Sequence, residues 1–465
     1  MASLLLIVLS LTYLTPSLAS DIETRCSKIC HSLQEDHIKE QCKTTCLSWY
    51  YNNNNNNHHQ EASEKDVNKE KKGEEKHNPY YFGEERYEHW TRTQHGHFKV
   101  LERFSKRSKL LAGIENYRLA ILKAEPYTFI MPSHWDVDEV FYVTRGQGTI
   151  TLLWEGNRES YDIKEGDIMT IPSGVIVYLI NKDSNEKLRI AMLLQPVSLP
   201  GRFEEFFGVG GKNPETFYTT FSNEVLQAAF NTPLDRLKRL FGKQEKGVII
   251  RASEEQITAL SKSSTEGEGG PRTPFNVLSK QPSHANNYGQ LYEANVNDYQ
   301  FLRELDVDIS IANISQGSMM APNYNSRSTK IALVVQGSGY FEMACPHISK
   351  ELEESKERNY KEHGQSYHLV RSQVRRGSVF VIPASHPVAA VASKNENLLV
   401  LCFGTRAENN DKFFLAGKNN VLNQMEREAK ELAFDWPAEE VDEVFNAQPE
   451  SVFFPAPEGR GPFMA

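Results

Sequence analysis

The chain has 465 residues, of which 39% are hydrophobic and 24% are charged, and its formal net charge is −9. This length is too great for one ordinary core and suits two or three domains. The negative charge argues against a nucleic acid or an anionic membrane as a partner, because both attract positively charged protein surfaces.

Residues 1–20 have the pattern of a secretory signal peptide. A short apolar run covers residues 4–14, and small residues near Ala19 offer a cleavage site. No later stretch of the sequence approaches the about 20 consecutive apolar residues that span a membrane. We therefore expect a soluble mature protein that enters the secretory pathway and meets oxidising conditions.

Residues 21–50 contain four cysteines in two pairs, and three residues separate the members of each pair. Cysteines four positions apart face the same side of a helix, so two antiparallel helices would be joined by two disulfides. The expected pairs are Cys26 with Cys46 and Cys30 with Cys42, and the other two pairings remain open. A zinc site is the less favoured alternative, because zinc ligands usually have closer spacing.

Residues 51–77 are predicted to form a disordered linker. Six asparagines occupy residues 52–57, and a charged stretch follows up to Lys76. A segment of this composition cannot bury enough apolar surface to fold.

From residue 78 onward the chain repeats itself, which is the most informative feature of the sequence. Each copy has short apolar strands that end at glycine turns, followed by helices. The matching segments are 141–148 with 333–339, 166–174 with 377–385, and 230–233 with 434–437. The copies cover residues 78–260 and 281–458. Residues 261–280 join them, because this stretch begins rich in Ser, Gly, Glu and Pro.

Both copies resemble the cupin family. Glu139 precedes Gly146 by the spacing of the first cupin motif, and residues 166–181 fit the second motif, with Val177 in the place of its histidine. Short strands with glycine turns independently suggest a β-sandwich or a jelly-roll barrel. The resemblance implies a mainly β protein. It has two tandem cupin (jelly-roll β-barrel) domains, each followed by α-helices, after a short disulfide-linked helical hairpin.

More closely, the chain resembles the vicilins, the 7S seed globulins. The segments typical of that family are 78–82 (NPYYF), 110–118 (LLAGIENYR), 247–252 (GVIIRA), 343–347 (MACPH) and 420–428 (NVLNQMERE). This resemblance implies a homotrimeric reserve protein that is kept in the protein storage vacuole of seeds and digested at germination. The cysteine-rich segment is similar to the hairpin peptides at the front of some vicilin precursors.

The positions that hold Mn or Fe in active cupins have lost most of their ligands. An active site uses three imidazoles and one carboxylate. The first copy has Pro132, His134, Glu139 and Val177 at these positions, and the second copy has Asn323, Asn325, Lys330 and Val388. We therefore expect no Mn or Fe site. His134 and Glu139 form either an acid–base or weak metal-binding pair or, as the favoured alternative, a hydrogen-bonded polar pair inside the barrel.

The second copy could instead hold a small anion. Lys330 would be a lone cation inside a barrel, and the nearby side chains of Asn323, Asn325 and Arg327 are hydrogen-bond donors. A small carboxylate would satisfy this set.

A separate metal site is predicted at Cys345, His347 and His386. Alternate residues on a strand face the same side, so Cys345 and His347 could point at one ion. His386 follows the second motif of the same barrel, and a thiolate with two imidazoles suits copper. The resemblance to copper-carrying vicilins implies the same site, which Tyr80 or, as the less favoured choice, Tyr81 could complete. The alternative is an inert buried cysteine beside two surface histidines.

Asn313 begins the one N-glycosylation sequon, although the apolar residues before it suggest that the site is buried. A storage protein needs no active site, and this reading explains the missing ligands. The alternatives are a copper-dependent redox protein resembling a superoxide dismutase, a small-anion or sugar-binding bicupin, and a released hairpin acting in defence. A trimer is favoured by apolar positions in the first helical tail, namely Leu234, Leu237, Leu240 and Phe241.

Overall fold

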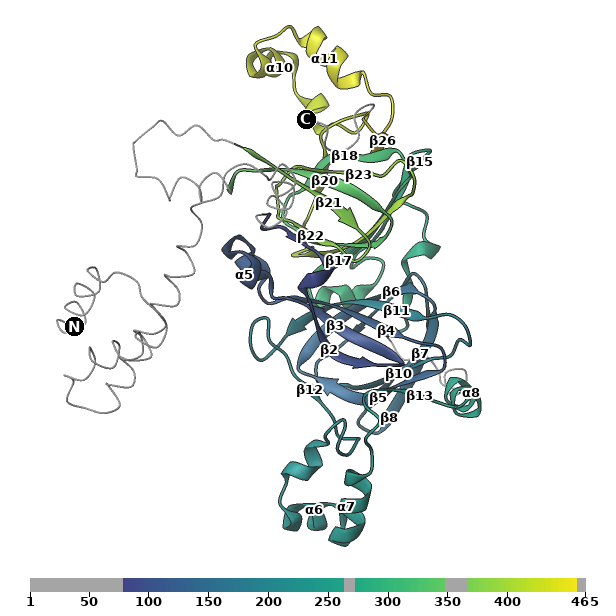
Figure 1. The fold of residues 1–465 in the computed structure, drawn as a ribbon. Helices are drawn as coiled ribbons and strands as arrows, with labels where there is room; N and C mark the ends of the chain where they lie inside the picture. Colours follow the sequence, from purple (N-terminus) through teal and green to yellow (C-terminus); the bar gives the residue numbers. More distant parts are fainter. Residues whose placement is uncertain (1–77, 263–271, 348–366, 458–465) are drawn as a thin grey trace, which may run out of the picture. The chain divides into compact units, whose positions relative to one another are not determined.

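The computed structural model describes residues 78–262, 272–347 and 367–457. The predicted signal peptide, the hairpin cysteines Cys26, Cys30, Cys42 and Cys46, and the linker 51–77 lie outside these residues. In the part that is described, antiparallel strands dominate and the helices are short (Figure 1). None of the described helices is long and apolar enough to cross a membrane.

The first repeat forms two antiparallel sheets that face each other. The strand order is β14-β9-β6-β11-β4-β3-β2 in one sheet and β12-β5-β10-β7-β8 in the other, where β13 also pairs with β5. The strands are β2 (Tyr87–Thr93), β3 (Gly96–Leu101), β4 (Arg118–Ala124), β5 (Thr128–Trp135), β6 (Val137–Arg145), β7 (Gln147–Trp154), β8 (Asn157–Lys164), β9 (Asp167–Ile171), β10 (Ile176–Asn181), β11 (Leu188–Pro196), β12 (Glu205–Phe206), β13 (Ile249–Arg251) and β14 (Phe275–Asn276).

The second repeat forms an equivalent pair of sheets. Their strand orders are β1-β22-β19-β24-β17-β16-β15 and β21-β20-β23-β18-β25, with β26 also paired to β18. The strands are β1 (Tyr81–Phe82), β15 (His284–Asn286), β16 (Gly289–Ala294), β17 (Val307–Ile314), β18 (Ser318–Asn325), β19 (Thr329–Gln336), β20 (Ser338–Cys345), β21 (His368–Arg375), β22 (Val379–Ile382), β23 (Val388–Ala392), β24 (Leu398–Thr405), β25 (Lys412–Phe414) and β26 (Phe453–Pro455).

The repeated glycines have a common structural reason. Gly146 and Gly337 end the matching strands β6 and β19 with positive φ angles of 82° and 83°. This left-handed region is strained for any residue with a Cβ atom. A Cβ on Gly146 would also lie 2.6 Å from the Lys187 carbonyl oxygen. The two turns therefore require glycine both for conformation and for space.

Two short strands exchange between the repeats. β1 precedes the first barrel in the chain but pairs with β22 of the second barrel, with Tyr81 opposite Phe380. β14 lies in the segment predicted to join the copies, and it pairs with β9 of the first barrel. The largest buried cluster also contains side chains from both repeats, for example Leu193 and Leu401. The interior of the first barrel forms a separate cluster around Phe141.

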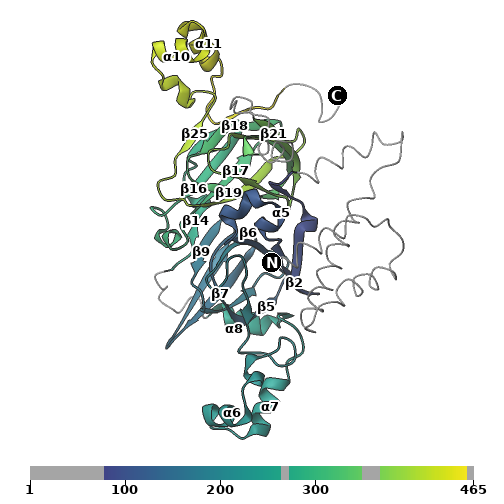
Figure 2. The ribbon, with the colours of Figure 1, turned by 90° about the vertical axis from the view of Figure 1, so that its left-hand side faces the viewer.

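Short helices follow each barrel, as the repeat predicted. Figures 1 and 2 show α6 paired with α7, and α10 paired with α11, apart from the strands. Ser222 caps α6 by accepting a hydrogen bond from the Val225 amide. The α-helices are α5 (Phe104–Arg107), α6 (Asn223–Phe230), α7 (Leu234–Gly242), α8 (Glu254–Lys262), α10 (Arg427–Phe434) and α11 (Ala438–Asn446), and the 3-10 helices are η2 (Glu84–Arg86), η3 (Lys109–Ile114), η4 (Phe217–Thr220), η5 (Val277–Ser279), η6 (Gln300–Glu304) and η7 (Val421–Gln424).

Candidate functional site

The fold brings Cys345, His347 and His386 together. Cys345 ends β20, where alternate side chains are buried, and it is fully inaccessible to solvent. His386 lies on the turn between β22 and β23 and is also buried, whereas His347 is exposed. One ligand atom from each residue lies within 4.8 Å of the others. The predicted set is therefore assembled in space.

Tyr80, and not Tyr81, borders this cluster. The Tyr80 hydroxyl lies 3.3 Å from the Cys345 Sγ atom. The Tyr81 hydroxyl instead lies 3.3 Å from Ser378 Oγ. The Tyr80 carbonyl oxygen accepts a hydrogen bond from the Val381 amide, so the arm that contains β1 is held against β22 at this point.

The donor atoms fit a soft metal ion. His386 is fixed by a 2.9 Å contact between its Nδ1 atom and the Ala384 carbonyl oxygen. The same imidazole also interacts with the side chain of Cys345. Burial lowers the pKa of His386, but the Cys345 side chain and the Ala384 carbonyl oxygen raise it above its ordinary value. A thiolate with two imidazoles is a set that copper prefers.

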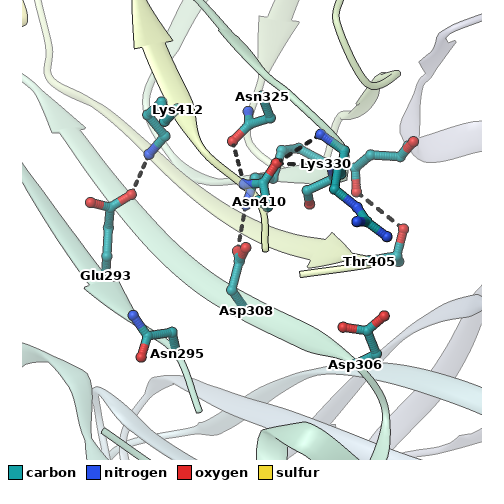
Figure 3. Close-up of polar contacts among 12 residues, drawn as sticks. Glu293, Asn295, Asp306, Asp308, Asn325, Lys330, Thr405, Asn410 and Lys412 are labelled. Atoms are coloured by element: carbon teal, nitrogen blue, oxygen red, sulfur yellow. Dashed lines mark hydrogen bonds and ion pairs between the residues drawn. The ribbon is translucent and has the colours of Figure 1, made fainter. Parts of the chain in front are cut away.

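The second barrel contains a pocket of about 60 Å³ whose lining includes Asn323, Asn325 and Lys330. Figure 3 shows Asn325, Lys330 and Lys412 of this lining together with the acids Asp308 and Glu293. Lys330 forms an ion pair with Asp308, and Lys412 forms one with Glu293. The expectation that Lys330 is a lone cation was therefore wrong.

Arg327 does not belong to this pocket. Its side chain is exposed and does not line the cavity, so its predicted role in an anion site was wrong as well. Burial raises the pKa of Glu293, but Lys412 outweighs burial and lowers this pKa to about 2. Asp308 and Glu293, the acids that pair with these two lysines, were not predicted from the sequence. Asp308 alternates with apolar residues on β17, and this pattern could have identified it as a barrel-facing acid.

The first barrel differs from the expectation at His134. This imidazole stacks on Phe206 with ring centroids 5.1 Å apart, and it does not line the barrel cavity. Ser133 and Trp135 line the cavity together with Glu139. The reason is register, because Val177 pairs with Ser133 just as Val388 pairs with Asn323 in the second barrel. His134 and Glu139 therefore form no acid–base pair.

Asn313 and Cys402 both lie on strands of the second barrel. Asn313 is partly buried in β17, which pairs with strands on both sides, β16 and β24. Cys402 lies on β24, and burial raises the pKa of its thiol to about 11. An un-ionised thiol in this setting packs as a small apolar group. Glycosylation of Asn313 stays a prediction.

The comparisons with known proteins agree with this architecture. A family model described as cupin matches residues 119–233 and 275–442. A vicilin from Juglans regia is 51% identical over 82% of this chain and 79% of its own length. The crystal structure of vicilin from Corylus avellana is 50% identical, covers 82% of this chain and 100% of its own, and has a TM-score of 0.75.

A vicilin structure from Solanum melongena is 38% identical and has a TM-score of 0.78. It covers 82% of this chain and 99% of its own, and its description reports different anionic ligands in structurally similar pockets. The two paired barrels and these matches define a cupin protein with two barrels. Within that class the chain belongs to the vicilin family of seed storage globulins.

Proposed function

We propose that this vicilin acts as a nutrient reserve without enzymatic activity at either barrel, and that it carries an ancillary copper site. The family relationship carries the storage function. Comparing the protein's abundance across tissues tests it, because a reserve protein is concentrated in seeds and scarce elsewhere. Similar low amounts in leaf, root and seed would contradict a reserve role.

Catalysis by Mn or Fe is not expected at the cupin positions. In the second barrel, Lys330 stands at a ligand position of the cupin motif and pairs with Asp308, and an ammonium group cannot ligate a metal ion. In the first barrel, the β5 residues that line the cavity with Glu139 are Ile130, Met131, Ser133 and Trp135, and none of them has an imidazole or a carboxylate. Elemental analysis of purified protein after dialysis should find neither metal in stoichiometric amount.

The copper site rests on the convergence of Cys345, His347 and His386. When bound, copper would supply one-electron redox chemistry. The chain's own residues would hold it through the Cys345 Sγ atom and two imidazole nitrogens, and the Tyr80 hydroxyl, 3.3 Å from that Sγ atom, would complete the site. Because the thiol must ionise to bind the ion, copper affinity falls as pH falls. The role is then metal reserve or protection against oxidation.

Site-directed variants test this copper proposal. Cys345→Ser and His386→Ala should each lose most of the bound copper in elemental analysis. Cys402→Ser is the matched control, because it removes the other cysteine of the described residues without touching the cluster. Equal copper content in all four proteins would exclude the site. A superoxide dismutation assay on the copper-loaded wild type and on Cys345→Ser then tests the redox alternative.

A homotrimer is the proposed assembly. Leu237 and Phe241 are buried between α6 and α7, so they are not available for the contact with another copy of the chain that the sequence had suggested. Other apolar side chains of the tails are exposed: Leu240 at 64%, Leu432 at 86% and Val444 at 72%. Exposed apolar positions on both tails favour burial against other copies in a closed ring. Sedimentation that finds only monomer at micromolar concentration would contradict this assembly.

A small carboxylate in the second pocket is a second candidate function. Anionic ligands are described for the Solanum melongena vicilin in structurally similar pockets. Here the amides of Asn323 and Asn325 and the ammonium group of Lys330 line the space. Because Lys330 already pairs with Asp308, an anion has to share this cation and should bind weakly. Calorimetric titration with acetate, for wild type and Asn325→Leu, tests the idea, and equal heats would reject it.

Entry into the secretory pathway and delivery to the storage vacuole are also proposed, from residues 1–20. Sequencing the N-terminus of protein from isolated storage vacuoles tests this route. A mature chain that begins near residue 20 or later supports it, and an intact Met1 contradicts it.

A further inference from the structure

The interior of the first barrel contains an apolar cavity of about 90 Å³ that opens to solvent at its mouth. Strands from both sheets contribute its walls. Among the described residues that line it are no lysine, arginine or histidine. Typical lining side chains are Phe98, Phe141, Val177 and Met192. An apolar cavity with a few polar groups in its wall suits a small organic molecule.

Glu139 is a buried polar side chain inside this cavity, and one of its carboxyl oxygens lacks a hydrogen-bond partner among the described residues. It lies on β6 and is 7% exposed, and its Oε1 atom is buried without a hydrogen bond among the described residues. Burial raises the pKa of Glu139 to about 8, and no charged neighbour contributes to this shift. In neutral and mildly acidic solution the group is therefore a neutral carboxylic acid, whose hydroxyl can donate a hydrogen bond.

The other titratable side chains that line the cavity are Glu205 and Tyr178. Glu205, on β12, accepts a hydrogen bond of 2.8 Å from Ser133 Oγ, and Trp135 Nε1 donates to the same Ser133 oxygen at 3.2 Å. Burial raises the pKa of Glu205, and these neighbours partly offset the rise. Glu205 is thus already engaged, and Tyr178 is only partly buried, so Glu139 is the buried donor available to a guest.

We propose that the first barrel binds a small, neutral and mostly apolar molecule that carries one hydrogen-bond acceptor, such as a carbonyl oxygen, and that Glu139 donates a hydrogen bond to it. An anion is disfavoured because two carboxyl groups and no cation line the cavity. A cation is disfavoured because it requires Glu139 to ionise in apolar surroundings, which costs desolvation energy. A neutral acceptor satisfies the buried donor without creating a charge.

The two pockets of the chain would then differ in selectivity. Lys330 and Lys412, each paired with an acid, line the second pocket. The first pocket offers an un-ionised acid in an apolar wall. The inference stands apart from the storage and copper proposals, because neither of them depends on a ligand in the first barrel.

Calorimetric titration of the full chain with four small probes tests this selectivity. Acetophenone is neutral and has a carbonyl acceptor, α-methylstyrene has the same shape without the acceptor, benzylamine is a cation and benzoate is an anion. At pH 6 acetophenone should bind roughly two- to tenfold more tightly than α-methylstyrene, the usual net value of one hydrogen bond. At pH 9, where Glu139 is ionised, this preference should disappear.

Three variants assign the preference to Glu139. Glu139→Gln keeps an N–H donor but cannot ionise, so it should retain the preference at both pH values. Glu139→Leu should bind both neutral probes with equal affinity. Glu245→Gln makes the same chemical change on an exposed carboxylate and should behave like the wild type.

Several results would overturn the proposal. One is tighter binding of benzylamine or benzoate than of acetophenone at pH 6. Another is an unchanged preference for acetophenone in Glu139→Leu, which would place the binding elsewhere. The absence of acetophenone binding up to its solubility limit would also reject it.

Discussion

Replacing Lys330 with methionine tests whether this lysine, at a metal-ligand position of the cupin motif, stabilises the fold through its ion pair with Asp308. The side chains of Lys330 and Asp308 are only 6% and 16% exposed, so both charges are largely removed from water. Removing one partner of a buried pair leaves the other charge uncompensated, which costs about 3–5 kcal/mol. Lys330→Met should therefore lower the melting temperature by roughly 6–20 °C, at 2–4 °C per kcal/mol for a domain of this size.

The double variant Lys330→Met/Asp308→Leu sharpens this prediction. Once both charges are gone, the apolar replacements carry no desolvation penalty, and most of the lost stability should return. Lys212→Met is the control, because its pair with Glu245 is exposed and should leave the melting temperature nearly unchanged. Calorimetric unfolding at one fixed protein concentration is the assay, since association shifts apparent stability. Additive losses in the double variant would refute the reasoning.

Three further predictions follow from particular residues. Glu139 has a pKa of about 8 in the folded protein and an ordinary value of 4.5, so the folded state loses stability as pH rises between these values. The free energy of unfolding of Glu139→Gln should therefore exceed that of the wild type by on the order of a few kcal/mol at pH 9 and by little at pH 4. Equal differences at both pH values would contradict this. Leu432→Ser combined with Val444→Ser should weaken the trimer in sedimentation experiments, and an unchanged dissociation midpoint would count against burial of these side chains. Gly337→Ala should destabilise the fold by about 1–3 kcal/mol because of the positive φ at this position. The control Gly113→Ala adds a Cβ into open space. Similar losses of stability in both variants would contradict the claim that the turn at residue 337 requires glycine.

The barrels could be predicted from the sequence because their signals are local. Gly146 and Gly337 end strands at matched places in the two copies, and their positive φ angles explain why glycine stands there. The proximity of Cys345 and His386 was expected because the strands next to the two cupin motifs are neighbours in a barrel, and β20 does pair with β23. The strand alternation invoked for His347 does not apply, because β20 ends at Cys345.

The parts that could not be predicted depend on distant partners. Lys330 and Asp308, which form an ion pair, are 22 positions apart in the sequence and lie on different strands. Motif spacing alone placed His134 in the cavity, whereas the pairing of Val177 with Ser133 turns His134 outward. The pairing of β1 with β22 spans nearly 300 residues, and a strand of two residues carries no recognisable pattern of its own.

The most direct test of the central claim is the amount of this chain in seeds through maturation and germination, measured by quantitative mass spectrometry. A reserve vicilin should accumulate to a large share of seed protein during maturation and fall steeply once the seedling begins to grow. Peptides from both barrels should disappear together. A low and constant amount through both stages would contradict the account, because a protein with a storage function has to be both stockpiled and consumed.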